Sequence, residues 1–149
     1  MVKVLIKKLD PAVKLPEYKT EGASGMDLIA FLKETINVKS KTSSLIPTGL
    51  SVAFLKDYEI QIRPRSGLAA KNNISVLNTP GTIDSDYRGE IKVIIYNHGN
   101  NDFSINNGDR IAQMILAPVV KMELEETIDL PETIRGKSGF GSTGKWNQS

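Results

Sequence analysis

The apolar residues of this chain come in short runs, and turn-forming residues interrupt them. The runs cover residues 50–54, 58–63, 74–77, 91–96, 111–116 and 119–124. Several are rich in Val and Ile, which suit a half-buried pleated strand. Clusters such as Asn78-Thr79-Pro80-Gly81 and Asn106-Asn107-Gly108-Asp109 separate them. Many short strands with this punctuation predict an all-β domain, either a sandwich, a jelly roll or a barrel.

One segment, residues 66–72, is typical of a short helix. Its composition allows one or two turns, with Ser66 near the N-cap. Such a helix would direct free N–H groups and the positive end of its dipole towards Pro64-Arg65-Ser66-Gly67.

The chain has 149 residues, without an internal repeat or an interdomain linker, so one domain is expected. The last 15 residues differ from the rest, because they mix four glycines with Ser, Thr, Lys and Arg135 and hold no acidic side chain. We therefore divide the chain into a β-barrel domain, 1–134, and a flexible glycine-rich arm, 135–149. The residues alone leave two readings of the arm open: a disordered terminus, or a lid that closes over an anion.

Several function classes are excluded by composition. The absence of Cys excludes disulfides, thiolate catalysis and Cys-ligated metals. The single histidine, His98, lies in a turn-like sequence, which excludes a His-centred triad or a multi-His metal site. A net charge of +2 does not argue for a nucleic-acid partner. There is no signal-peptide h-region and no apolar stretch of roughly 18–20 residues, so we expect a cytoplasmic protein without a membrane partner.

Two segments combine charged and phosphate-friendly residues. Asp27 lies in an apolar, strand-like run, where an unpaired carboxylate is costly; it is either a structural acceptor or part of a site. Arg65 and Ser66 at a helix start either grip a phosphate or form a helix end with a surface arginine.

Two further segments offer polar groups in an apolar setting. Residues 78–91 are typical of a long β-hairpin that could present backbone groups to a flat base. In an extended stretch Asp84 and Asp86 would face the same side, one orienting water and the other pairing with Arg88; the alternative is a solvated acidic turn. Gln113, alone in an apolar strand, is either structural or functional.

Taken in order, five segments resemble the motifs of the trimeric dUTPase family, and the resemblance covers residues 22–144. The segments are Ala23-Ser24-Gly25-Met26-Asp27-Leu28, Pro64-Arg65-Ser66-Gly67-Leu68-Ala69, Gly81-Thr82-Ile83-Asp84-Ser85-Asp86-Tyr87-Arg88-Gly89-Glu90, Gly108-Asp109-Arg110-Ile111-Ala112-Gln113 and Gly139-Phe140-Gly141-Ser142-Thr143-Gly144. The resemblance implies a homotrimer of distorted jelly-roll or β-barrel subunits, each with one short helix.

The resemblance also implies an activity. It is the Mg2+-assisted hydrolysis of dUTP to dUMP and pyrophosphate by water attack on the α-phosphorus. This reaction keeps uracil out of DNA and supplies dUMP for dTMP synthesis. Asp84 would be the general base. Asp27 would support the metal through water, and no strong direct protein ligand to Mg2+ is expected.

The implied nucleotide-binding residues fall into three groups. Asn78 with backbone groups near Thr82 and Ile83 would read uracil, and Tyr87 would pack against deoxyribose and exclude a 2′-hydroxyl. Phosphates would be held by Arg65, Ser66 and Gly67, with Gln113 near the α-phosphate. The arm would close over the nucleotide of another subunit through Arg135, Phe140, Gly141, Ser142 and Thr143. The chain departs from the family at Ser138, where a glycine is common.

Two other functions are compatible with a resemblance of this kind. A dCTP deaminase, including its bifunctional form, shares the fold; Asp84 with Tyr87 and the Phe140 block favour dUTPase instead. A catalytically idle relative would act as a regulatory binding protein; the retention of Asp84, Ser66, Gln113, Arg135 and Phe140 argues against that.

Overall fold

The fold is that of a computed structural model, which describes residues 1–142 and residue 144. Within these residues the elements are β1 (Leu5–Lys8), β2 (Met26–Ile29), β3 (Ile36–Val38), β4 (Ser43–Pro47), β5 (Leu50–Ala53), β6 (Tyr58–Arg63), α1 (Ser66–Asn72), β7 (Ile74–Val76), β8 (Gly81–Ile83), β9 (Lys92–Asn97), β10 (Phe103–Ile105) and β11 (Arg110–Pro118). Short strands with one short helix confirm the predicted all-β class.

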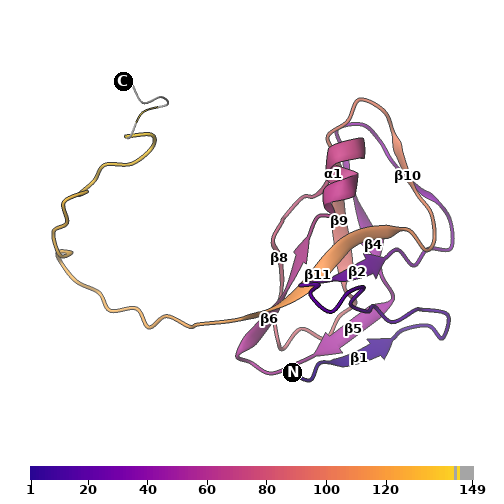
Figure 1. Cartoon of the computed structure of the whole chain (residues 1–149), viewed down its shortest axis with the longest axis horizontal. Coiled ribbons are helices and arrows are strands. Elements are labelled where there is room, and N and C mark those ends of the chain that lie inside the picture. Colours follow the sequence, from indigo (N-terminus) through magenta and orange to yellow (C-terminus); the bar gives the residue numbers. More distant parts are fainter. Residues whose placement is uncertain (143, 145–149) are drawn as a thin grey trace.

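The strands of the described residues form four antiparallel groups, with orders β2-β11-β6-β8, β4-β9-β7, β1-β5 and β10-β3. They enclose one body, with α1 at one end of it (Figure 1). Most partners are far apart in sequence. The last strand, β11, lies between β2 and β6. Strand β8 follows β7 and precedes β9 in the chain, but it pairs with β6, whereas β7 and β9 pair with each other. This jelly-roll-like crossing brings segments from distant parts of the chain together.

A core of branched aliphatic side chains fills the space between the sheets. Leu28, Ile46, Ile91 and Ile95 are fully buried within it. Buried polar side chains are hydrogen-bonded, as burial requires. Thr48 Oγ1 donates to the Ile91 carbonyl at 2.6 Å, and Asn97 Nδ2 donates to the Val38 carbonyl at 3.0 Å. These two side chains thus tie together backbone segments that are far apart in sequence.

Helix α1 has the bounds expected from the sequence. Its N-cap is Arg65, one residue earlier than expected, and no side chain caps it. The C-cap, Asn73, adopts the left-handed conformation (φ 55°), and its N–H bonds to the Ala69 and Leu68 carbonyls. Asn tolerates this conformation better than most residues, which explains why the helix ends here.

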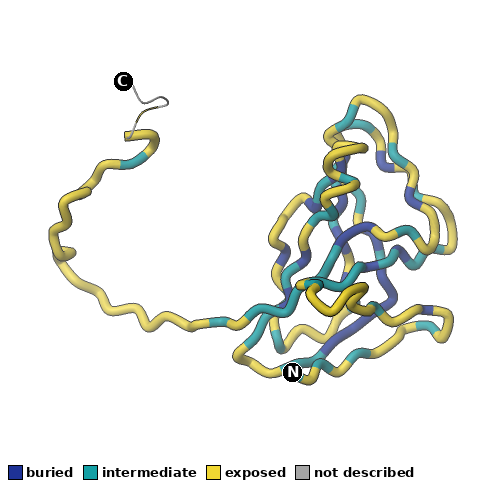
Figure 2. The backbone as a smooth tube through the Cα atoms, in the orientation of Figure 1, coloured by how far each residue is buried: buried dark blue, intermediate teal, exposed yellow. Residues whose placement is uncertain are grey.

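One predicted strand, residues 119–124, is wrong. Strand β11 ends at Pro118, and the last backbone tie to the body is the Val119 N–H to the Asp57 carbonyl at 2.8 Å. Residues 120–138 are exposed and run away from the body (Figure 2). The alternating Val120, Met122 and Leu124 fit a half-buried strand, but they have no partner strand within the residues that the structure describes. The expected division at 134/135 stays a prediction.

In the described part of the chain, no helix has the length and hydrophobicity needed to cross a membrane.

Candidate active site

The start of α1 presents unused backbone donors to an open surface. Arg65 is extended (φ −90°, ψ 128°), and the first intrahelical N–H bond is donated by Ala69, to the Arg65 carbonyl. The N–H groups of Ser66, Gly67 and Leu68 precede that bond and are free to face a ligand. A Cβ built on Gly67 would meet no atom within 4 Å. The helix start thus has both donors and space for an anion.

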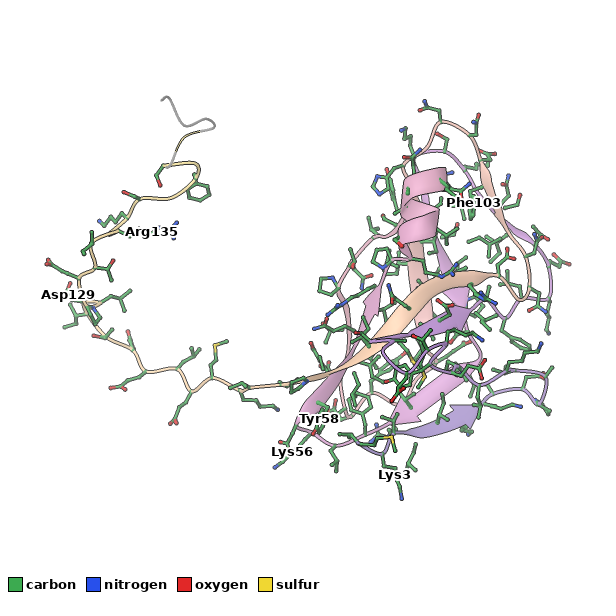
Figure 3. All side chains as sticks on the ribbon, in the orientation of Figure 1. Lys3, Lys56, Tyr58, Phe103, Asp129 and Arg135 are labelled. Carbon is green, nitrogen blue, oxygen red and sulfur yellow. The ribbon has the colours of Figure 1, made fainter. Side chains whose placement is uncertain are left out.

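Asp27 and two arginines form an ion-pair cluster beside this helix start. Arg65 Nε donates to Asp27 Oδ1 at 2.9 Å, and Arg110 Nε lies 3.9 Å from Asp27 Oδ2. Arg65 Nη1 also donates to the Arg110 carbonyl at 3.3 Å. The cluster borders two open hollows. One of them is lined by Phe103, which lies beside α1 (Figure 3). Arg110 was not selected as a site residue from the sequence, and the only signal for it was a charged residue at the start of an apolar strand.

Gln113 belongs to the same cluster. It lies opposite Asp27 across β2 and β11, and its Nε2 donates to the Pro64 carbonyl at 3.0 Å. Gly25 makes room for it, because a Cβ there would lie 2.9 Å from Gln113 Oε1. The structure therefore brings together Asp27, the Arg65–Gly67 segment and Gln113, all of which were selected from the sequence.

The segment from Asn78 to Ile91 is not the predicted β-hairpin. Its single strand, β8, pairs with β6, while the following strand, β9, pairs with β4 and β7. Residues 84–87 form a tight turn in which the Tyr87 N–H donates to the Asp84 carbonyl at 3.1 Å. Because Ser85 and Asp86 occupy the turn, the chain is not extended there, and the same-face argument for Asp84 and Asp86 is wrong.

The predicted ion pair between Arg88 and one of these two aspartates is also wrong, since Arg88 forms no ion pair within the described residues. Its Nη1 donates to the carbonyls of Ser85 and Tyr87, at 2.7 and 3.1 Å. The Arg88 side chain thus stabilises the turn by hydrogen bonds to the backbone carbonyls of the turn. Tyr87 Oη donates to the Glu90 carbonyl at 3.0 Å, and Gly89 lies against the ring, since a Cβ there would be 2.3 Å from Oη. The turn holds the Tyr87 ring in place while leaving it exposed.

Asp84 is far from the ion-pair cluster of the same chain. Ile83 lies opposite Ile60 on β6, whereas Gln113 lies opposite Arg63. Strands rise about 3.3 Å per residue and lie about 4.8 Å apart, so Asp84 is on the order of 14 Å or more from Gln113. One chain therefore carries two separate halves of the candidate site, namely the Asp27–Arg65–Gln113 cluster and the Asn78–Tyr87 segment.

The predicted arm residues lie apart from both halves. Arg135 is on the extended segment away from the body (Figure 3), and its Nε donates to the Ser138 carbonyl at 2.8 Å. Phe140 and Gly141 have positive φ (51° and 86°), and Ser138 does not share that conformation. Phe140 and Ser142 are exposed. Thr143 lies outside the described residues.

Three comparisons with known proteins point to one family. A family model described as dUTPase matches residues 12–144. The deoxyuridine 5'-triphosphate nucleotidohydrolase of Rickettsia rickettsii (strain Sheila Smith) is 55% identical over 145 residues, covering 97% of this chain and 98% of that protein. The protein of the same name from Fusobacterium nucleatum subsp. nucleatum is 52% identical over 146 residues, covering 97% and 100%.

Solved structures share the fold. A dUTPase of Staphylococcus bacteriophage 80alpha with dUpNHpp superimposes with a TM-score of 0.85 at 23% identity, covering 95% of this chain and 98% of that chain. A dUTPase from phage phi11 of S. aureus, solved to describe the coordination of a structural Mg(II) ion, gives 0.78 at 20% identity, covering 87% and 99%. Given the matched span of 12–144 and these identities, the chain belongs to the dUTPase family.

Proposed function

We propose that this chain hydrolyses dUTP to dUMP and pyrophosphate. One observation carries the proposal: Arg65, the free N–H groups at the start of α1 and Gln113 gather on one open surface, as a triphosphate site requires. Family membership and the names of the relatives support dUTP as the nucleotide. In this site Arg65, Ser66 and Gly67 bind phosphate oxygens, and Gln113 assists near the α-phosphate.

The Asn78–Tyr87 segment is the proposed reader of the nucleoside. Strand β8 pairs with β6 on one side, and within the described residues its other edge is unpaired, so backbone groups of Thr82 and Ile83 remain open to a base edge. The Asn78 side chain lies next to Gly81, where a Cβ would be 3.1 Å from Nδ2. Cytosine reverses the donor and acceptor pattern of uracil, so a site built for uracil would reject it.

In the proposed reaction, the Asp84 carboxylate accepts a proton from a water molecule while the water oxygen attacks the α-phosphorus. The bond from the α-phosphorus to the oxygen that bridges to the β-phosphorus breaks. Pyrophosphate leaves with that oxygen and its electron pair, and dUMP remains. Because water is the nucleophile, no covalent intermediate with the chain forms.

Mg2+ is the proposed cofactor. No group of three His, Cys, Asp or Glu side chains within residues 1–142 could enclose a metal. Asp27 is the single carboxylate of the cluster, and its two oxygens face Arg65 and Arg110. It can accept a hydrogen bond from a metal-bound water, but it does not form a protein cage for the ion. This donor set fits Mg2+, which keeps several waters and binds largely through substrate phosphates. When bound, the ion neutralises charge on the triphosphate.

A homotrimer with shared active sites is the proposed assembly. The separation of Asp84 from the Asp27–Arg65–Gln113 cluster supports it, because the two halves can meet only between chains. The arm supports it too. Its apolar side chains are exposed in the single chain, including Met122, Leu124 and Ile128. In the proposed trimer the arm crosses to another subunit, where Arg135 binds the γ-phosphate and Phe140 stacks on uracil.

A substrate panel tests this function. The full chain with Mg2+ is mixed with dUTP, dCTP, dTTP or UTP, and pyrophosphate release is followed. Rapid release from dUTP, with far less from the other three, is expected. Comparable turnover of dCTP would contradict the uracil-reading role of the Asn78–Tyr87 segment. Release of ammonia from dCTP would indicate the deaminase alternative, and tight binding of dUTP without turnover would indicate a regulatory relative.

A further inference from the structure

Arg110 shares a carboxylate with Arg65, and the proposed reaction gives it no part. Asp27 has an exposed side-chain fraction of 21%, Arg65 of 31% and Arg110 of 54%. Arg65 makes the close contact, at 2.9 Å, whereas Arg110 stands at 3.9 Å. Two guanidinium groups around one carboxylate leave one positive charge in excess. The more exposed arginine is also the more weakly held of the two.

A β-bulge places Arg110 beside Asp27. The register between β11 and β2 joins Gln113 to Asp27 and Ala112 to Leu28, and then shifts so that Arg110, not Ile111, lies opposite Ile29. Since paired residues face the same side of a sheet, the shift places Arg110 on the face of Asp27 and Gln113. Ile111 is left unpaired and buried in the core. Bulges often re-aim a side chain in this way next to a site.

We infer that Arg110 is a positioning residue that neutralises Asp27 when Arg65 turns from it to a phosphate. This inference rests on the proposed function. Arg65 Nε donates to Asp27 and Nη1 donates to the Arg110 carbonyl, so a bidentate grip on phosphate that uses Nε requires the guanidinium to turn away from Asp27. A half-buried carboxylate without a cation is unfavourable. Arg110 is already within ion-pair range, and a shift of about 1 Å would bring it to hydrogen-bond distance.

The contact between the two arginines supports this exchange. Arg65 Nη1 donates to the Arg110 carbonyl, so the side chain of one is tied to the backbone of the other. A turn of Arg65 about this contact would free the nearer Asp27 oxygen without breaking every tie to β11. The alternative is that Arg110 itself binds phosphate, and the two roles differ in how they depend on Asp27.

A double-mutant cycle separates these roles. The affinity of the full chain for dUpNHpp is measured by calorimetry for Arg110→Gln, Asp27→Asn and the double variant. If Arg110 acts through Asp27, Arg110→Gln weakens binding roughly tenfold in the unaltered chain and less than about twofold in Asp27→Asn. Equal losses in both backgrounds would overturn the inference, because a direct phosphate contact does not need Asp27.

Two controls accompany the cycle. Lys56→Gln removes one positive charge from the turn between β5 and β6, at the end of the body away from α1 (Figure 3), and is expected to change the affinity less than about twofold. Arg110→Lys keeps a cation near Asp27 and is expected to recover part of the loss. A tenfold loss in Lys56→Gln would show that net charge, not position, governs binding and would overturn the inference.

A second measurement needs no nucleotide. Urea unfolding is compared for Arg65→Gln, Arg110→Gln and the double variant, at one protein concentration. Each single variant leaves Asp27 one cation, so the loss of stability in the double variant should exceed the sum of the single losses. Additive losses would overturn the inference.

The binding measurements separate this inference from the proposed function. If the unaltered chain does not bind dUpNHpp, the proposed function fails. If the unaltered chain binds dUpNHpp but the effects of Arg110→Gln and Asp27→Asn are additive, only the role of Arg110 is contradicted.

Discussion

Asp84 occupies an exposed turn, and its only role in the proposed reaction is to accept a proton from water. We expect Asp84→Asn to keep nucleotide binding and to lower turnover by about 10²-fold or more, since the amide cannot act as a base. Single-turnover kinetics together with dUpNHpp affinity check this. Asp86→Asn, two residues away in the same turn, is the matched control and should retain activity. A near-normal rate for Asp84→Asn would remove it from the general-base role.

Tyr87 is expected to set the preference for deoxyribose. Its ring is held by the hydrogen bond to the Glu90 carbonyl and by close packing on Gly89. Tyr87→Ala should lower the ratio of kcat/KM for dUTP over UTP by about tenfold or more, because space opens for the 2′-hydroxyl. Tyr87→Phe keeps the ring and should retain most of the discrimination. If both variants lose it equally, the hydroxyl rather than the ring matters.

Which residues lie together was predictable where residue type and local context sufficed. Asp27, Arg65 and Gln113 were selected from the sequence, and the structure brings them together. Arg110 was missed because its position depends on a register shift in the pairing of β11 with β2, and the residue pattern does not predict such a shift. The pairing of Arg88 with one of Asp84 and Asp86 was wrong because it assumed an extended chain, whereas the segment turns at Ser85 and Asp86.

At the scale of elements, six-residue strands with a clear apolar pattern were predictable, such as the alternating β6 and the Val- and Ile-rich β9. The missed strands, β1, β3, β4 and β10, have three to five residues and are held by distant partners. Local propensity is a weak guide to such strands, because cross-strand packing decides them. Residues 119–124 show the opposite error, since a suitable pattern has no partner strand in the described part of the chain.

The packing of β2 against β11 depends on Gly25. A Cβ there would lie 2.9 Å from Ile115 Cγ1 and 3.2 Å from the Met114 carbonyl oxygen. We expect Gly25→Ala to lower the free energy of unfolding by about 1–3 kcal/mol, as overpacking does, and to weaken dUpNHpp binding by displacing Gln113. Urea unfolding and calorimetry check both effects. Gly22→Ala is the control, because a Cβ at Gly22 meets no atom within 4 Å.

The whole molecule is a folded body and a long extended arm, and two truncations separate the roles of the arm. Deletion of residues 135–149 is expected to leave a folded trimer with weak activity, because only the proposed lid is lost. Deletion from residue 120 also removes the exposed apolar residues and is expected to weaken the trimer. Light scattering and pyrophosphate release check both. Loss of the trimer in the shorter deletion would mean that the glycine-rich segment is structural.

The position of β11 has a consequence for how the protein is made. A ribosome releases the chain from its N-terminus, so β2 and β6 emerge long before the strand that lies between them. Until residues 110–118 have emerged, the sheet that joins Asp27 to Gln113 cannot close. A nascent chain therefore acquires its proposed phosphate-binding surface only after residues 110–118 have emerged. Any product that terminates before residue 110 lacks it entirely and is expected to be a substrate for proteolysis, not a partly active enzyme.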